Sequence, residues 1–202
     1  MKKFFLFFVA ILNISIAHAD PEFKEGVHYN STKLTESSQP EILEFFSYYC
    51  PPCAAFEPII AKLQKTLPEG VTVKKNPVAF LGREMGPEMQ RAYAVASLLN
   101  IEDKLTPALF DKIHVQRQPP MSRDDVRKIF ADNGVNTEEF DSTINSFTVS
   151  GMLSQFDRNT EHYNVRGTPA FLVNGKYMVK IESLASEQQF IKLITYLLAM
   201  RN

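Results

Sequence analysis

The sequence predicts an α/β fold with an inserted helical subdomain. A short apolar strand, a helix and a second strand follow one another between residues 41 and 80. From Gly86 to about His162 the apolar residues recur at helical spacing, with no internal repeat. Strand character returns at residues 170–179, and an amphipathic helix follows. The helical block therefore lies between the two parts of one sheet-containing unit.

The first 19 residues have the composition of a secretory signal peptide. Lys2 and Lys3 form a charged start, an apolar run extends from Phe4 to Ile16, and Ala17-His18-Ala19 is a small-x-small cleavage site. The apolar run is shorter than the roughly 20 residues that span a bilayer. We therefore expect cleavage after Ala19 and export to an oxidising compartment, where a disulfide persists.

Charge excludes one class of partner. The precursor has a formal net charge of −1, and removal of Lys2 and Lys3 takes away two positive charges and leaves −3. The sequence has no run of like charges and no basic stripe. We therefore expect no nucleic-acid partner.

The first strand and helix bracket the only two cysteines of the chain. Glu41–Phe46 reads as a short buried strand, and Cys50-Pro51-Pro52-Cys53 follows it. Pro51 suits the first turn of a helix, where a missing N–H costs little. The expected helix has one apolar stripe and stops at Pro68: Phe56, Ile59, Ile60, Leu63 and Leu67.

The later elements have recognisable ends. Residues 71–80 predict the second strand. In the helical block, Ser122 and Gly134 bracket one helix, and Thr137 is expected to cap the next, with two glutamates in its first turn and an apolar pattern that continues to Phe156. Asn174-Gly175 between two apolar runs predicts a hairpin, and Ser186 with Gln189 resembles a capping box for the last helix.

Two structural explanations of the cysteine pair are weak. A disulfide that closes a four-residue ring contributes only about 2 kcal/mol by chain entropy, against about 4.7 kcal/mol for a hundred-residue loop. A structural zinc site needs four ligands. After signal cleavage the chain offers only His28, His114 and His162, each isolated in the sequence from the cysteines and from the other two.

A redox-active pair uses the spacing directly. Two cysteines at i and i+3 lie one helical turn apart, close enough to form a disulfide. If Cys50 lies at a helix start, unpaired backbone N–H groups and the helix dipole favour its thiolate, which is the reactive form. The sequence therefore favours a redox site over a clamp or a zinc site.

Residues 44–53, EFFSYYCPPC, occur together with residues 165–169, VRGTP, ahead of the Asn-Gly hairpin. This combination is highly specific, and by it the chain resembles the DsbA family of periplasmic disulfide oxidases over nearly all of its mature length. The resemblance implies a thioredoxin-like fold, and the chain is expected to divide into three parts. Residues 1–19 are the signal peptide, 20–80 and 163–202 the thioredoxin-like domain, and 81–162 the helical insertion.

The resemblance also implies roles for the matched residues. Cys50 exchanges with substrate, Cys53 is its buried partner, and Pro51 and Pro52 support the site. Thr168-Pro169 is a cis pair that faces the disulfide, where Thr168 pairs with a bound peptide and tunes potential and partner choice. Without the resemblance, a trans proline opening an edge strand is the commoner interpretation. The substrate-binding segment is Arg166, Gly167, Thr168 and Pro169.

Glu44 is a charged residue inside an otherwise apolar strand. A single charged strand residue usually faces solvent at an edge. The resemblance instead implies a buried carboxylate beneath the disulfide, paired with Lys75 or, as the weaker choice, Lys74. Burial raises the pKa of a carboxyl group, so Glu44 could carry a proton to or from Cys53.

Pro52 departs from the family, whose members commonly have histidine at this position. Proline supplies neither a ring donor nor a backbone N–H to the Cys50 thiolate. Losing a hydrogen bond to a charged acceptor costs about 1.5–3 kcal/mol, or roughly one to two pKa units. The substitution predicts a milder oxidant.

The resemblance implies a periplasmic enzyme that donates its disulfide to newly exported proteins with free thiols, and a monomer is the default expectation. It implies no cofactor and no metal beyond the Cys50–Cys53 disulfide, and reoxidation by a DsbB-like membrane quinone reductase. Two alternatives stay open. One is a periplasmic disulfide reductase or isomerase, which Pro52 makes less remote; the other is a non-enzymatic chaperone that binds peptides through apolar surface near Pro169.

Overall fold

A five-stranded mixed sheet forms the centre of the computed structural model, which describes residues 22–201. The predicted signal peptide and its cleavage site lie outside the described residues. The strand order is β1-β5-β4-β2-β3. Only β2 and β3 run parallel, while the other neighbouring pairs are antiparallel. The strands are β1 (Tyr29–Ser31), β2 (Ile42–Phe46), β3 (Val73–Pro77), β4 (Ala170–Val173) and β5 (Tyr177–Val179).

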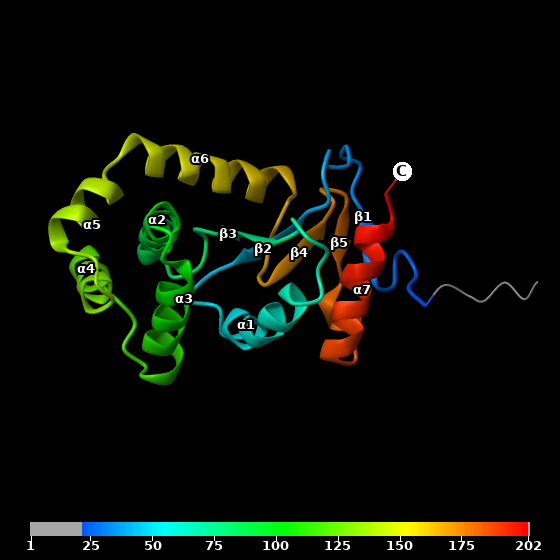
Figure 1. Ribbon diagram of the computed structural model, residues 1–202, viewed down its shortest axis with the longest axis horizontal. Helices are drawn as coiled ribbons and strands as arrows, with labels where there is room; N and C mark the ends of the chain where they lie inside the picture. Colours follow the sequence, from blue (N-terminus) through cyan, green and yellow to red (C-terminus); the bar gives the residue numbers. More distant parts are fainter. Residues whose placement is uncertain (1–21, 202) are drawn as a thin grey trace, which may run out of the picture.

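Two helices cover one face of the sheet. α1 (Pro51–Gln64) joins the parallel strands β2 and β3, and α7 (Glu187–Ala199) ends the described chain (Figure 1). Alternate residues of β2 point to opposite faces. Ile42 therefore packs with α1 and α7, while Phe45 packs with Leu172 on the other face. Glu44 has the parity of Ile42, so its carboxylate points to the side of α1.

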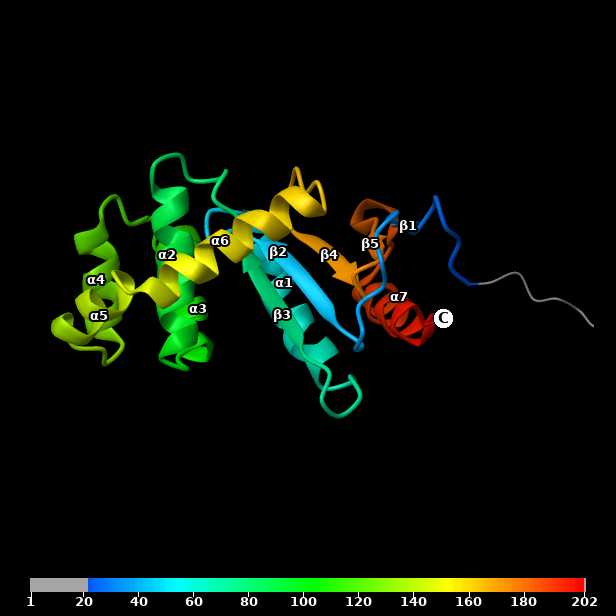
Figure 2. The ribbon, with the colours of Figure 1, turned by 90° about the horizontal axis from the view of Figure 1, so that it is seen from above.

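The inserted helices pack at the end of the sheet, as Figures 1 and 2 show from two directions. α6 returns from this block across the sheet to β4. The helices are α2 (Met85–Leu98), α3 (Glu102–Phe110), α4 (Arg123–Asp132), α5 (Thr137–Ile144) and α6 (Phe147–His162), with a π-helical turn η1 (Asp111–Val115) after α3 and a short 3-10 turn η2 (Ile181–Ser183) before α7.

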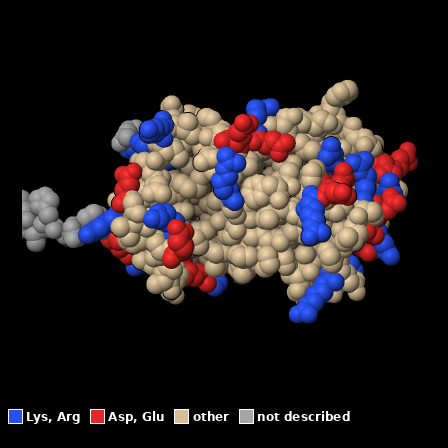
Figure 3. Space-filling view, turned by 180° about the vertical axis from the view of Figure 1, so that it is seen from behind, with Lys and Arg blue, Asp and Glu red and all other residues tan. Residues whose placement is uncertain are grey.

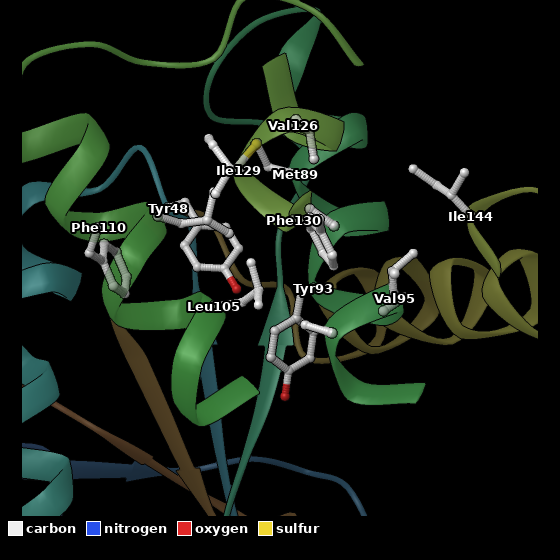
Figure 4. Packing of buried hydrophobic residues seen from close by; sticks show 14 of the residues in the cluster. Tyr48, Met89, Tyr93, Val95, Leu105, Phe110, Val126, Ile129, Phe130 and Ile144 are labelled. Carbon is white, nitrogen blue, oxygen red and sulfur yellow. The ribbon is translucent and has the colours of Figure 1, made fainter. Parts of the chain in front are cut away.

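One hydrophobic core connects the insertion to the cysteines. Cys50 and Cys53 belong to the same buried cluster as the inner faces of α2, α3 and α4. Tyr48 extends into this cluster from the turn after β2, and its ring lies 5.2 Å from that of Phe110, centroid to centroid (Figure 4). The helical subdomain therefore packs directly against the segment that carries the disulfide.

Some predicted helix ends are confirmed and others are wrong. Ser122 caps α4, and Gly134 follows its end with φ of +95°. Thr137 is not the cap of α5: Asn136 accepts the N–H of Glu139, and asparagine is among the strongest capping residues. The apolar pattern to Phe156 also spans two helices, because Ser146 caps a new one.

The strand predictions are right in place and imprecise in length. Of the predicted strand 71–80, only Val73–Pro77 forms a strand, which is β3. β1 was not predicted, because three residues at a sheet edge are too few to show alternation. α1 ends at Gln64, before Leu67, because Pro68 has no N–H to donate to the Gln64 carbonyl and its ring would clash with that carbonyl in a continued helix. Asn174 and Gly175, with φ of +54° and +66°, form the predicted hairpin turn.

Candidate active site

Cys50 and Cys53 form a disulfide at the amino end of α1. Their Cα atoms are 5.2 Å apart. Cys50 is the N-cap residue and is 4% exposed, whereas Cys53 is completely buried. An incoming thiolate therefore has access to one sulfur only, that of Cys50.

The helix start offers the Cys50 sulfur little backbone hydrogen bonding. Pro51 and Pro52 occupy the first two helical positions and have no N–H. The N–H of Cys53 donates to Cys50 Sγ over 3.2 Å. Of the first three positions in α1, Cys53 alone can donate in this way.

The peptide bond between Thr168 and Pro169 is cis, as the family resemblance implied. The carbonyl oxygen of Thr168 lies 3.4 Å from Cys50 Sγ. The Thr168 hydroxyl is buried and has no hydrogen-bond partner within the described chain. Arg166 and Gly167 precede this pair at exposed positions, and the Arg166 guanidinium donates to Asn164. The backbone of Thr168 thus borders the Cys50 sulfur.

A buried charge cluster lies on the same face of the sheet as α1. Glu44 is completely buried, and its Oε2 lies 3.0 Å from Lys75 Nζ. Lys75 forms a second, short ion pair with Glu57 of α1. Lys74, the weaker choice of partner for Glu44, instead pairs with Glu41 at the surface. The expected Glu44–Lys75 pair is therefore present.

Glu57 is the site residue that the sequence reading missed. It lies four residues after Cys53, so the two side chains are neighbours on one helix face. Its side chain is 27% exposed, whereas that of Glu44 is 0% exposed. The i+4 spacing from Cys53 was the available signal. Glu57 connects the buried cluster to solvent and to the helix face that carries Cys53.

Burial sets the proton affinity of Glu44. Desolvation raises the pKa of Glu44 to about 7, even though the Lys75 charge opposes this and Glu57 adds to it. Burial lowers the pKa of Lys75, but the charges of Glu44 and Glu57 outweigh this and raise it overall. Lys75 therefore stays cationic at neutral pH, where Glu44 is close to half protonated.

Replacing Glu44 by glutamine is expected to remove a pH dependence of stability. Glu44 binds its proton more tightly in the folded protein, with a pKa of about 7, than in the unfolded chain at about 4.5. Stability therefore falls as pH rises through this window and is lowest above pH 7. Glu44→Gln cannot ionise, so its free energy of unfolding at pH 8 should exceed the wild-type value by about 3 kcal/mol, with little difference at pH 4.

Urea unfolding of the oxidised protein at both pH values measures this difference. Glu41→Gln is the control, since Glu41 pairs with the exposed Lys74 at the start of the same strand. An equal pH dependence in wild type and Glu44→Gln would contradict the assignment.

The helical subdomain holds the turn before Cys50 through three hydrogen bonds. The Tyr48 hydroxyl meets Thr106 Oγ1 at 3.3 Å, and the Tyr49 hydroxyl donates to the Pro120 carbonyl at 2.9 Å. His114 Nε2 lies 2.8 Å from the carbonyl oxygen of Tyr48. His114, considered above only as a zinc ligand, thus contacts the backbone two residues before Cys50. Its position in a π-helical turn is typical of functional sites.

The surface around the site is largely uncharged. The carboxyl end of β2 and the amino ends of α1 and β4 point to the side opposite the view of Figure 1 (Figure 2). Figure 3 faces that side, and charged groups gather toward its two ends and in one cluster near its upper edge. Residues other than Lys, Arg, Asp and Glu occupy much of the middle of this face.

Residues 22–201 contain neither a candidate metal site nor a helix that could span a membrane. No group of three or more His, Cys, Asp or Glu side chains there is arranged to hold a metal ion. None of the helices in this part of the chain combines the length and hydropathy needed to cross a bilayer.

Comparison with known proteins gives concordant matches. Residues 41–191 match the sequence model of the DSBA-like thioredoxin domain. The chain is 36% identical over 187 residues to the thiol:disulfide interchange protein DsbA of Pectobacterium carotovorum subsp. carotovorum, covering 91% of this chain and 89% of that protein. Its identity to DsbA of Escherichia coli K12 is 32% over 206 residues, covering 98% of each.

A similar solved structure is a complex of Proteus mirabilis DsbA with a non-covalently bound peptide. Its TM-score is 0.81 at 33% identity, covering 90% of this chain and 100% of that one. The agreement extends to the fold, which is the predicted thioredoxin-like fold with a helical insertion.

Proposed function

Because the chain belongs to the family of DSBA-like thioredoxin proteins and is a thiol-disulfide oxidoreductase, we propose that it donates its Cys50–Cys53 disulfide to unfolded exported proteins in the periplasm. The observation that carries this proposal is the arrangement of the disulfide. Cys50, at a helix start beside the Thr168 backbone, keeps 4% exposure, whereas Cys53 is completely buried.

The transfer takes two exchanges. A substrate thiolate attacks Cys50 Sγ, the Cys50–Cys53 bond breaks, and Cys53 leaves as a thiolate. A second substrate thiolate then attacks the substrate sulfur of the mixed disulfide, and Cys50 leaves. The substrate gains a disulfide and loses two electrons, which remain on the two cysteines. No further cofactor is needed for this step.

The charge cluster supplies a proton to the buried sulfur. Cys53 leaves in an environment from which water is excluded, where a thiolate is costly. Glu57 lies one turn from Cys53 and is ion-paired through Lys75 to Glu44, whose pKa of about 7 allows it to hold or release a proton at neutral pH. We assign Glu44, Lys75 and Glu57 to this proton transfer.

The segment around the cis bond binds substrate. The Thr168 carbonyl faces the reactive sulfur, so an extended peptide linked to Cys50 lies within reach of backbone pairing there. Arg166 and Gly167 continue the same exposed segment, and Pro169 ends it.

After transfer the enzyme is reduced and must be reoxidised. We propose a DsbB-like membrane quinone reductase as the oxidant, cleavage of the signal peptide near Ala19, and action as a monomer. The sequence of residues 1–19 and the family relationship support these assignments.

Pro52→His is expected to make the protein a stronger oxidant. Histidine restores a ring donor and a backbone N–H at the second position of α1, next to Cys50 Sγ. One added charge-assisted hydrogen bond lowers the Cys50 pKa by roughly one to two units and raises the potential by about 30–60 mV. Thiolate absorbance against pH and a glutathione titration measure the two quantities. Pro51→Ala serves as a control for loss of proline alone, and an unchanged pKa in Pro52→His refutes the account.

Pro52 also favours one alternative activity, disulfide reduction or isomerisation. With two prolines at the helix start, the Cys50 thiolate has fewer donors, and the reduced pair is stabilised less than in a histidine-bearing relative. A reduced pair that is less stable gives up electrons more easily.

Transfer to a reduced, unfolded protein with two thiols tests the proposed function. The oxidised enzyme is mixed with one equivalent of this substrate, and free thiols are then labelled with a mass tag. The enzyme is expected to gain two labelled thiols while the substrate loses two. If the substrate loses its thiols no faster with the enzyme than without it, the proposal fails.

A further inference from the structure

The segment that carries Thr168 and Pro169 joins the carboxyl end of α6 to β4. α6 ends at His162 and β4 begins at Ala170, so residues 163–169 form the whole connection. β4 is fixed on both sides by its pairing with β2 and β5. The position of the Thr168 carbonyl beside Cys50 Sγ therefore depends on how the end of α6 is held.

A buried asparagine of β3, Asn76, faces this end of α6. It is completely buried. Side chains alternate along a strand, so Asn76 points away from the face of Lys75, which is paired with Glu57 of α1. α6 and α1 lie on opposite sides of the sheet (Figures 1 and 2). The Asn76 side chain is therefore enclosed between β3 and α6.

The Asn76 amide is hydrogen-bonded at both ends. Its Nδ2 donates to the carbonyl oxygen of Phe156 at 3.1 Å and to Thr160 Oγ1 at 3.3 Å. Its Oδ1 accepts a hydrogen bond from Asn159 Nδ2 at 2.9 Å. All three partners lie in the last two turns of α6. One side chain of the sheet thus holds the helix end through three hydrogen bonds.

A polar contact of this kind fixes the position of α6 more narrowly than an apolar contact. Exchanging buried polar partners for apolar groups of similar shape can be nearly neutral for stability. Hydrogen bonds, however, have distance and angle requirements that restrict sliding and rotation of the helix. The Thr160 carbonyl also accepts the N–H of Val165 at 2.9 Å. A chain of hydrogen bonds therefore runs from β3 through α6 to the segment that leads to Thr168.

We propose that Asn76 is a positioning residue for disulfide exchange. It acts through α6 and holds residues 163–169 where the Thr168 backbone meets a peptide linked to Cys50. This inference rests on the proposed function, which assigns peptide binding to residues 166–169. Displacing a bound substrate by about 1 Å can lower a rate by as much as a hundredfold. Loosening the end of α6 should therefore impair reaction with peptides more than exchange with a small thiol.

Asn76→Leu tests this role, with oxidation of a two-thiol peptide and of dithiothreitol measured side by side. For the peptide, kcat/KM is expected to fall about tenfold, mainly through KM, equivalent to about 1.4 kcal/mol of binding. Dithiothreitol has no peptide backbone to pair with Thr168, so its rate should stay unchanged, as should the reduction potential of the cysteine pair. Thr160→Val keeps the side-chain shape and removes one acceptor. It should lose about threefold with the peptide and carries the test if Asn76→Leu does not fold.

Hydrogen–deuterium exchange at the Val165 amide gives a readout that is independent of activity. This N–H should exchange about tenfold faster in Asn76→Leu than in wild type. Asn133→Ala is the matched control, because Asn133 also donates a side-chain amide hydrogen to a helix carbonyl, that of Ile129 in α4. The control should keep the wild-type peptide kinetics and the wild-type exchange at Val165.

The outcomes separate this inference from the proposed function. Wild-type peptide kinetics in the folded variants overturn the positioning role, and so does an equal loss with peptide and dithiothreitol. An equal loss in Asn133→Ala also overturns it, because the effect would then follow stability alone. If wild type oxidises neither substrate, the proposed function fails, and exchange at Val165 still decides whether Asn76 holds the segment.

Discussion

A Cys53→Ser variant is expected to stop at the mixed disulfide, whereas a Cys50→Ser variant should form none. In Cys53→Ser the remaining Cys50 thiolate can attack a peptide disulfide at the protein surface, and no neighbouring thiol resolves the product. In Cys50→Ser the remaining thiol is that of Cys53, which is completely buried. Mass spectrometry under non-reducing conditions should show one peptide bound to the first variant and none to the second.

The two variants control for each other. Both lose the same four-residue disulfide ring, worth only about 2 kcal/mol, so a difference in stability does not explain a difference in adducts. Both should lose net disulfide transfer to the level of the uncatalysed reaction. A peptide adduct on Cys50→Ser, formed as fast as on Cys53→Ser, would contradict the assignment of Cys50 as the exchanging residue.

Lys75→Met is expected to destabilise the protein more at pH 8 than at pH 5, by up to about 1.4 kcal/mol, which is the free energy needed to protonate a group with a pKa of about 7 at pH 8. The substitution leaves the Glu44 carboxylate buried, with Glu57 as its nearest charge and no compensating cation in the cluster. At pH 5 Glu44 is protonated in the folded protein, because its pKa already exceeds that value with Lys75 present and rises without it. The loss at pH 5 should therefore be clearly smaller.

The double variant Lys75→Met/Glu44→Gln distinguishes an unpaired charge from a packing defect. If the cost comes from the charge, the double variant should regain most of the stability at pH 8 in a urea titration. An equally large loss in the single and double variants would show that the Lys75 side chain acts through packing, for example against the Phe46 ring, whose centroid lies 4.9 Å from Nζ.

Local signals in the sequence were sufficient for most of the architecture. Asn174-Gly175 requires positive φ at two successive residues, and Ser122 and Ser186 cap helices through their own hydroxyls, so each is visible within a few residues. At Asn136-Thr137 two capping residues are adjacent, and the stronger one, Asn136, forms the cap. The three-residue strand β1 depends on pairing with β5, which is distant in sequence.

Some features of the site could be predicted from the sequence and others could not. The Cys50–Cys53 disulfide was predicted from the spacing of the two cysteines, and the Glu44–Lys75 pair from the family resemblance. Glu57 was missed although its i+4 spacing from Cys53 was visible, because one glutamate on a helix usually faces solvent. The contact of His114 with the Tyr48 carbonyl could not be predicted, since it joins residues 66 positions apart across the two parts of the fold.

The reduction potential of the Cys50–Cys53 pair tests the central claim most directly. The mature protein is equilibrated with graded mixtures of reduced and oxidised glutathione, and its thiols are trapped with a mass tag, which suits a chain without tryptophan. A disulfide donor requires a potential well above the thioredoxin value of about −270 mV, and we expect this result. A potential near the thioredoxin value would contradict the account and show that, with Pro52 at the helix start, the pair serves as a reductant.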